Sequence, residues 1–160
     1  DREVGEGDMT REERLSELGF ELPTIEVGDR PLIPWVQVGN LLYTSGRTPD
    51  ASHKTGQVGS DVTTEEAYQA ARAIAAGQLA VAKTALGDLA RVKRVVKVLG
   101  MVNSAPGFGD QPAVINGFSD LLVEVLGEAG RHARSAVGMA GLPGNVSVEI
   151  EVIFEVADPA

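Results

Sequence analysis

The chain has no cysteine among its 160 residues, only two histidines, and few aromatic side chains. The absence of cysteine excludes disulfide bonds, thiolate catalysis and iron–sulfur clusters. His53 and His132 are far apart in sequence and show no metal-binding spacing, so we expect no metal site. No apolar run approaches the roughly 20 residues that a membrane-spanning helix needs, and we expect a cytoplasmic protein with no membrane partner.

Cationic residues are also scarce. The chain carries 14 Lys and Arg against 23 Asp and Glu, a formal net charge of −9. Affinity for nucleic acid depends on cationic patches that release counterions from the phosphate backbone, so this balance argues against a nucleic-acid partner. The sequence also offers no histidine pair for the acid–base work of a ribonuclease. The composition therefore argues against a ribonuclease or a translation inhibitor.

Length and composition fit one compact domain. With 43% hydrophobic residues in a chain of 160, there is enough apolar material for a single core. We expect this domain to span residues 21–160, after an N-terminal tail and a short helix within residues 1–20. Residues 1–8 are acidic and lack the basic-then-apolar order of a secretion signal. We interpret them as a tail or remnant ahead of a native start at Met9.

Capping signals and residue periodicity predict the order of helices and strands. Capping boxes at residues 10–13 and 63–66 predict the starts of a short helix and a long one. Gly87 ends the long helix, Pro112 suits the first turn of another helix, and Gly127 ends that one. Alternating or β-branched runs predict the strands. The predicted order is a helix at 10–18, strands at 35–38, 41–45 and 57–59, a helix at 63–86, a strand at 91–102, a helix at 112–126, and two final strands.

The two final strands are predicted to form a hairpin. Residues 146–156 alternate between apolar and polar side chains, residues 135–140 are small and apolar, and the Gly, Pro and Asn between them favour a turn. In such a hairpin, Arg134 and Glu149 lie on neighbouring strands within side-chain reach. On spacing alone, a solvent-exposed arginine beside surface glutamates is the more common outcome.

The element order predicts an α+β fold in which a mixed sheet carries two helices on one face, in the order β-β-β-α-β-α-β-β. The opposite sheet face is then left without a covering layer. It bears Ile153 and the valines around Val96, which are too apolar to remain in water. We therefore expect a second copy of the chain to cover this face.

Three segments resemble the signatures of the RidA/YjgF family of reactive enamine and imine deaminases, often labelled endoribonuclease L-PSP. They are residues 41–49 (LLYTSGRTP), the Ala-Arg-Ser of residues 133–135, and Leu-Pro at 142–143 followed by 148–151 (VEIE). The resemblance runs from about Pro34 to Val156. It implies a chorismate-mutase-like fold and a homotrimer with clefts between subunits. It also implies hydrolysis of small 2-imino or enamino acids to 2-keto acids and ammonia.

The resemblance also implies roles for individual residues. Arg134 corresponds to the arginine that binds the substrate carboxylate, and Glu149 to the glutamate that positions a water. Further substrate-binding positions implied by the resemblance are Ser45, Gly46, Asn116, Trp35 and Ala136. For Trp35, cleft lining and core packing remain equal alternatives. Ser45 lacks triad partners, so we expect its hydroxyl to bond to the backbone rather than act as a nucleophile.

The chain departs from the family pattern at three positions. His132 stands where many relatives have proline, Ala136 where the bacterial deaminases have cysteine, and Arg47 where glutamine is usual. These departures indicate a divergent branch.

Imine hydrolysis requires a clamped carboxylate and an oriented water but no cofactor, and Arg134 and Glu149 match those two tasks. The competing hypothesis is a non-catalytic regulatory protein that binds a small keto or amino acid through Arg134. The two hypotheses differ at Glu149, which hydrolysis needs more than carboxylate binding does.

Overall fold

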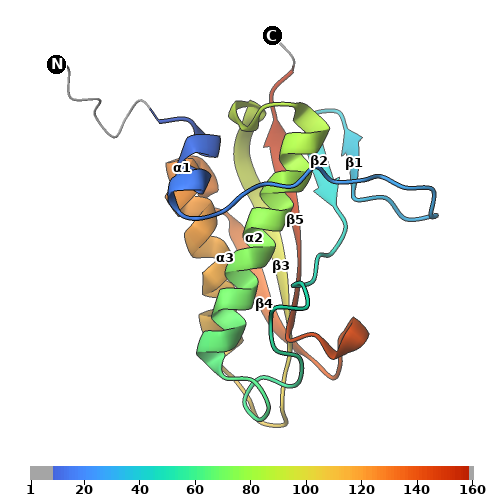
Figure 1. Cartoon of the computed structure of the whole chain (residues 1–160), viewed down its shortest axis with the longest axis vertical. Helices are drawn as coiled ribbons and strands as arrows, with labels where there is room; N and C mark the ends of the chain where they lie inside the picture. Colours follow the sequence, from blue (N-terminus) through green and yellow to red (C-terminus); the bar gives the residue numbers. More distant parts are fainter. Residues whose placement is uncertain (1–8, 159–160) are drawn as a thin grey trace, which may run out of the picture.

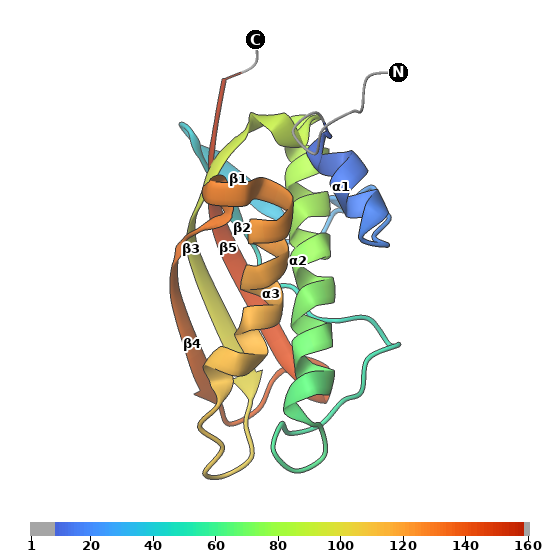
Figure 2. The ribbon, with the colours of Figure 1, turned by 90° about the vertical axis from the view of Figure 1, so that its left-hand side faces the viewer.

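The computed structural model describes residues 9–158. Two long helices lie side by side across one face of a five-stranded sheet, and a short third helix packs beside them (Figures 1 and 2). The elements are α1 (Arg11–Glu17), β1 (Trp35–Val38), β2 (Leu41–Thr44), α2 (Thr64–Leu86), β3 (Val92–Asn103), α3 (Gln111–Leu126), β4 (Ala133–Met139) and β5 (Val148–Val156). Three single-turn 3-10 helices, η2 (Leu89–Arg91), η3 (Gly127–Gly130) and η4 (Pro143–Asn145), connect them.

The helix ends lie where the capping signals predicted. The Thr63 hydroxyl accepts a hydrogen bond from the Glu66 backbone, and the Glu66 carboxylate accepts one from the Thr63 backbone, so the capping box of α2 is complete. Gly87 ends α2 at φ 85°, a left-handed conformation that glycine adopts without a Cβ clash. A second complete capping box, between Thr10 and Glu13, opens α1.

The predicted hairpin of the last two strands is wrong. The strand order is β1-β2-β5-β3-β4, so β3 separates β4 from β5. β4 runs parallel to β3, whereas β5 is antiparallel to both β3 and β2. The reason is the β3-α3-β4 unit, because a crossover through a helix returns the chain parallel to the strand it left. β4 thereby occupies one edge of β3, and β5 has to pair with the other.

The predicted edge strand at residues 57–59 is also absent. Val58 makes only isolated bridges, to Val62 and to Ser104. Gly56 and Gly59 adopt φ values of 122° and 99°, which bend the backbone on both sides of Val58 and prevent an extended run. This segment is a loop that leads into α2.

The hydrophobic core lies between the sheet and the helices. β5 supplies Val148, Ile150, Val152 and Phe154 to it, alternating with residues that point away. Leu15 of α1 is fully buried in the same core. The boundary expected after residue 20 remains a prediction, and the tail expected at residues 1–8 lies outside the described part of the chain.

The other face of the sheet carries exposed apolar side chains. Strand register places five large ones there, and they are Val36, Val38, Tyr43, Val137 and Met139. No helix lies over this face in the described part of the chain (Figure 2). Within residues 9–158, no helix has both the length and the apolar character needed to cross a bilayer.

Two glycines set how closely α3 approaches its neighbours. A Cβ on Gly100 of β3 would lie 2.6 Å from Ile115 Cδ1, so the missing side chain lets α3 settle onto the sheet. A Cβ on Gly117 of α3 would overlap the backbone oxygen of Tyr68 in α2. The two long helices therefore touch at a point where no side chain fits.

We expect Gly117→Ala to destabilise the protein, although alanine favours helix over glycine by about 0.8–1 kcal/mol. The backbone oxygen of Tyr68 cannot move without shifting α2, and overpacking of this kind typically costs on the order of 1–3 kcal/mol. Urea unfolding measures the change. Gly109→Ala is the matched control, because a Cβ on Gly109 meets nothing within 4 Å. A Gly117→Ala protein as stable as the wild type would rule out this close helix contact.

Candidate functional site

Arg134 is held by two side chains of α3. Its Nη1 donates hydrogen bonds to Asn116 Oδ1 at 2.9 Å and to Ser119 Oγ at 3.0 Å. Asn116 and Ser119 are three residues apart on a helix, so their side chains project from the same face. Within residues 9–158, the other N–H groups of this guanidinium have no partner. Arg134 is thus fixed from one side and keeps free donors for a ligand.

A chain of hydrogen bonds continues from Arg134 to the backbone. Ser119 Oγ lies 2.9 Å from His132 Nε2, and His132 Nδ1 lies 2.6 Å from the carbonyl oxygen of Gly130. Because a carbonyl only accepts, Nδ1 carries the proton. Burial, together with the charge of Arg134, lowers the pKa of His132 and favours the neutral ring. Nε2 therefore accepts from the Ser119 hydroxyl, whose own oxygen accepts from Arg134.

Glu149 lies in β5 on the sheet face that no helix covers. Its carboxylate contacts Gly46 so closely that a Cβ at residue 46 would overlap it. Gln78 of α2 holds the neighbouring backbone, because its Nε2 donates to Ser45 O at 3.0 Å and to Ile150 O at 2.9 Å. Burial, and the negative charge of Glu151, raise the pKa of Glu149. A carboxylate of this kind is a better proton acceptor than an exposed glutamate.

The prediction that Arg134 and Glu149 lie within reach of each other is wrong for a single chain. Arg134 pairs with Val98, which pairs with Val152 on the far side of β3. Val152 is buried under the helices, and residues in register share a face, so Arg134 points to the helix side. Glu149 is three residues from Val152 and points to the opposite side. The two strands are also separated by two interstrand spacings, roughly 10 Å.

The remaining predicted residues fall into two groups. Asn116 and Ala136 lie with Arg134, since Asn116 bonds to it and Ala136 follows it on the same face of β4. Gly46 lies against Glu149, and the carbonyl oxygen of Ser45 is linked through Gln78 to that of Ile150, the residue after Glu149. The Ser45 hydroxyl donates to Ile33 O at 2.6 Å, which confirms the expected bond to the backbone.

Trp35 packs against the hydrophobic core, one of the two alternatives that the sequence left open. It pairs with Thr44, on the opposite sheet face from Tyr43, so its indole lies on the helix side rather than beside Glu149.

Sequence reasoning did not identify Ser119 as a partner of Arg134. It considered His132 as a metal ligand and as a departure from a motif, and not as part of a hydrogen-bond chain. Ser119 carried a weak signal, because it lies one helical turn from Asn116. The hydrogen-bond chain Arg134–Ser119–His132 depends on the packing of β4 against α3, and no local sequence pattern predicts this packing.

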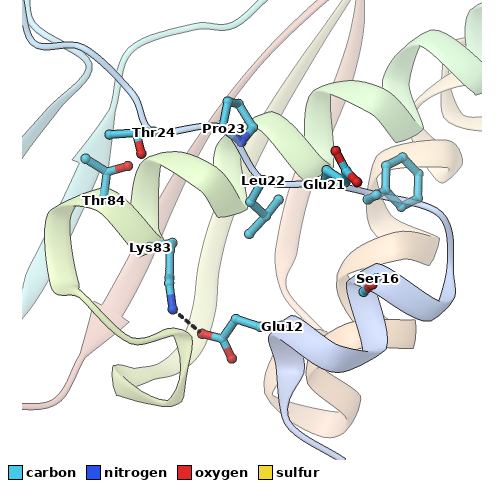
Figure 3. Close-up of a pocket in the computed structure, with 9 residues that line it drawn as sticks. Glu12, Ser16, Glu21, Leu22, Pro23, Thr24, Lys83 and Thr84 are labelled. Carbon is cyan, nitrogen blue, oxygen red and sulfur yellow. Dashed lines mark hydrogen bonds and ion pairs between the residues drawn. The ribbon is translucent and has the colours of Figure 1, made fainter.

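One hollow of the molecule lies away from these residues. It has a volume of about 560 Å³ and lies between α1, the segment after it and the end of α2 (Figure 3). Its main polar pair is already satisfied: Glu12 Oε1 lies 3.1 Å from Lys83 Nζ and accepts from Leu89 N at 2.9 Å. No cluster of three or more His, Asp or Glu side chains that could hold a metal ion occurs within residues 9–158.

Known proteins resemble this chain over most of its length. The protein "Atu1372" from Agrobacterium tumefaciens, solved as a structure of unknown function, superposes with a TM-score of 0.84 at 50% identity, covering 92% of each chain. Protein TCP17 of Trypanosoma cruzi is 43% identical over 88% of this chain and 91% of its own. "Putative regulator AldR" of Lactococcus lactis subsp. lactis is 34% identical over 77% of this chain and 87% of its own.

A family model also matches the chain from residue 12 to residue 156, described as "YjgF/chorismate_mutase-like, putative endoribonuclease". That range contains every strand of the sheet, both long helices, and the residues around Arg134 and Glu149. The mixed sheet with two helices on one face is the fold of that family. The chain therefore belongs to the RidA/YjgF family.

Proposed function

We propose that this protein hydrolyses small 2-imino acids, formed from their enamine tautomers, to 2-keto acids and ammonia. The observation that carries this proposal is the environment of two side chains, Arg134 and Glu149. Arg134 is held by Asn116 and Ser119 with donors to spare, and Glu149 is a carboxylate whose pKa burial raises. The first suits a substrate carboxylate and the second suits a water.

The chemistry requires little more than these two groups. The planar guanidinium of Arg134 grips the substrate carboxylate at two points, which fixes the position of the imine carbon. Glu149 accepts a proton from a water that adds to that carbon, forming a C–O bond while the C=N bond becomes single. The proton passes to nitrogen and gives a carbinolamine. Transfer of the hydroxyl proton to nitrogen, with cleavage of the C–N bond and formation of the C=O bond, then releases ammonia and the keto acid. No cofactor enters this balance.

A complete site needs two copies of the chain. Arg134 and Glu149 lie on opposite faces of one sheet, so a substrate can touch both only where two subunits meet. The exposed apolar side chains of the uncovered face, such as Val137 and Tyr43, give a second copy a surface to bury. We propose a homotrimer with three clefts, each combining Arg134 of one subunit with Glu149 of the next.

Glu149→Ala should abolish imine hydrolysis while leaving keto-acid binding largely intact, because the carboxylate is needed for the water and not for the grip. We expect a rate loss of roughly 10²-fold or more. A dehydratase acting on serine or threonine supplies the enamine in situ, and keto-acid and ammonia formation are followed with and without this protein. Glu155→Ala is the matched control, since Glu155 is a second glutamate of β5 on the same face.

The alternative function is binding without catalysis, which the name of the similar AldR protein favours. Both functions need Arg134. If the wild-type protein binds keto acids but accelerates no imine with a small, aromatic or acidic side chain, the hydrolase proposal fails and the regulatory one replaces it.

A mixture of two inactive variants tests the shared cleft. Arg134→Ala and Glu149→Ala should each be inactive alone. After subunit exchange at equal amounts, about one quarter of the clefts in a cyclic trimer combine both intact residues, so on the order of a quarter of wild-type activity should return. Light scattering reports the assembly itself. A mixture that stays inactive, or a stable monomer at micromolar concentration, would contradict the shared cleft.

The pH profile should reflect the environment of Glu149. It works as a proton acceptor only when ionised, and burial and Glu151 raise its pKa, so kcat/KM should fall on acidification at a higher pH than for an ordinary glutamate. Removing the negative charge in Glu151→Gln should lower that pKa and shift the acidic limb to lower pH. Glu155→Gln serves as the control. An acidic limb that does not move in Glu151→Gln would mean that another group limits the rate.

A further inference from the structure

Arg47 lies on the helix side of the sheet, behind the strand that carries Glu149. Its backbone N–H and carbonyl form a reciprocal pair of hydrogen bonds with Ile150, both at 3.0 Å. Ile150 is buried beneath the helices, and bridge partners share a sheet face, so the Arg47 side chain points toward α2. The Arg47 side chain therefore lies on the opposite sheet face from Glu149.

The guanidinium of Arg47 rests against a glycine in the middle of α2. A Cβ on Gly77 would lie 3.0 Å from Arg47 Nε. Gly77 stands inside a 23-residue helix, next to Ala75 and Ala76, where a residue of low helix propensity needs a reason. A glycine at residue 77 leaves room for the guanidinium of Arg47. The contact between Arg47 and Gly77 therefore indicates that α2 is shaped to accommodate this cation.

The charge of Arg47 has no counter-charge. The side chain is half-buried, yet it makes no hydrogen bond or ion pair within residues 9–158. Burial alone lowers the pKa of Arg47, with no compensating carboxylate. A cation removed from water without a partner is unfavourable, and a bound anion would relieve this.

A groove of about 390 Å³ opens beside Arg47, between residues 20–23, residues 47–50 and α2. Phe20 and Ile74 give it an apolar wall, and Glu21 and Asp50 also line it. Asp50 Oδ1 accepts a hydrogen bond from Ser52 N at 2.9 Å, which leaves Oδ2 of the same carboxylate for a ligand. Neither carboxylate forms an ion pair with Arg47 in the structure. The groove thus combines one cationic side chain, two acidic side chains that are not paired with it, and an apolar wall.

We propose that this groove binds an α-amino acid with an apolar side chain. The ligand's carboxylate would bond to Arg47, its ammonium to Asp50 or Glu21, and its side chain would pack against Phe20 and Ile74. A doubly charged anion fits less well, because the two carboxylates would repel it. This site is separate from the imine site and does not depend on the proposed hydrolysis.

Calorimetric titration of the whole protein with L-leucine, L-valine and L-phenylalanine tests the proposal. Arg47→Gln should weaken binding roughly tenfold to hundredfold, the contribution of a charge-assisted hydrogen bond. The backbone bridge to Ile150 survives this change, since it uses no side-chain atom. The control that should bind as the wild type does is Arg94→Gln, which removes an exposed cation of β3 outside the groove.

Ligands that lack one charge test the two-point grip. Relative to L-leucine, its 2-keto acid lacks the ammonium and 3-methylbutylamine lacks the carboxylate, so both should bind more weakly at the Arg47 groove. Gly77→Ala should raise the melting temperature, because alanine favours helix, yet weaken binding by crowding Arg47 Nε. A higher melting temperature together with weaker binding would show that this variant loses affinity without losing its fold. No binding of any of the three amino acids, or equal binding by the Arg47→Gln protein, would overturn the proposal.

Discussion

The alternation of side chains across a single sheet is the constraint on which the site depends. β3 lies between β4 and β5, and its register fixes which face each residue of the two outer strands presents. Arg134 consequently faces the helices and Glu149 faces away from them. A slip of one residue in either pairing would reverse this arrangement and also expose the core residues of that strand. The same burial that stabilises the fold therefore divides the site into two halves.

The helix side of the sheet gives Arg134 its rigidity. The missing side chain of Gly100 lets Ile115 settle on the sheet, and this places Asn116 and Ser119 within hydrogen-bond distance of the guanidinium. Held at Nη1, Arg134 loses less conformational freedom on binding a carboxylate than a free side chain would. Under the proposed function, the tight packing of α3 would therefore help to hold Arg134 ready for a carboxylate.

Local signals in the sequence predicted where the helices begin and end, but they did not predict which strands pair with each other. The capping box at Thr63 and the stop at Gly87 fix α2 through contacts within a few residues, so the sequence predicts them well. The partner of β4 depends on a crossover of the whole α3 helix, which periodicity does not record. The hairpin was a local interpretation of Arg134 and Glu149, and it failed because the two strands pair with a third.

The same distinction between local and nonlocal signals applies to the residues of the candidate site. The Ala-Arg-Ser motif pointed to Arg134 because it resembles a family signature that lies within three consecutive residues. Ser119 and His132 join Arg134 in a hydrogen-bond chain that forms only when β4 packs on α3, so this chain could be found only in the structure.

The side chain of Arg47 lies on the opposite sheet face from Glu149. The bridge between Arg47 and Ile150 uses only backbone atoms, so residue 47 can vary without disturbing Gly46 or Glu149 on the other face. The glutamine usual in the family is uncharged, and arginine at this position adds a cation on the helix side alone. Gly77 makes room for it, which means that two positions, on different elements, have to suit one guanidinium. A divergent branch can in this way acquire a new surface behind the sheet while the face that carries Glu149 stays as it was.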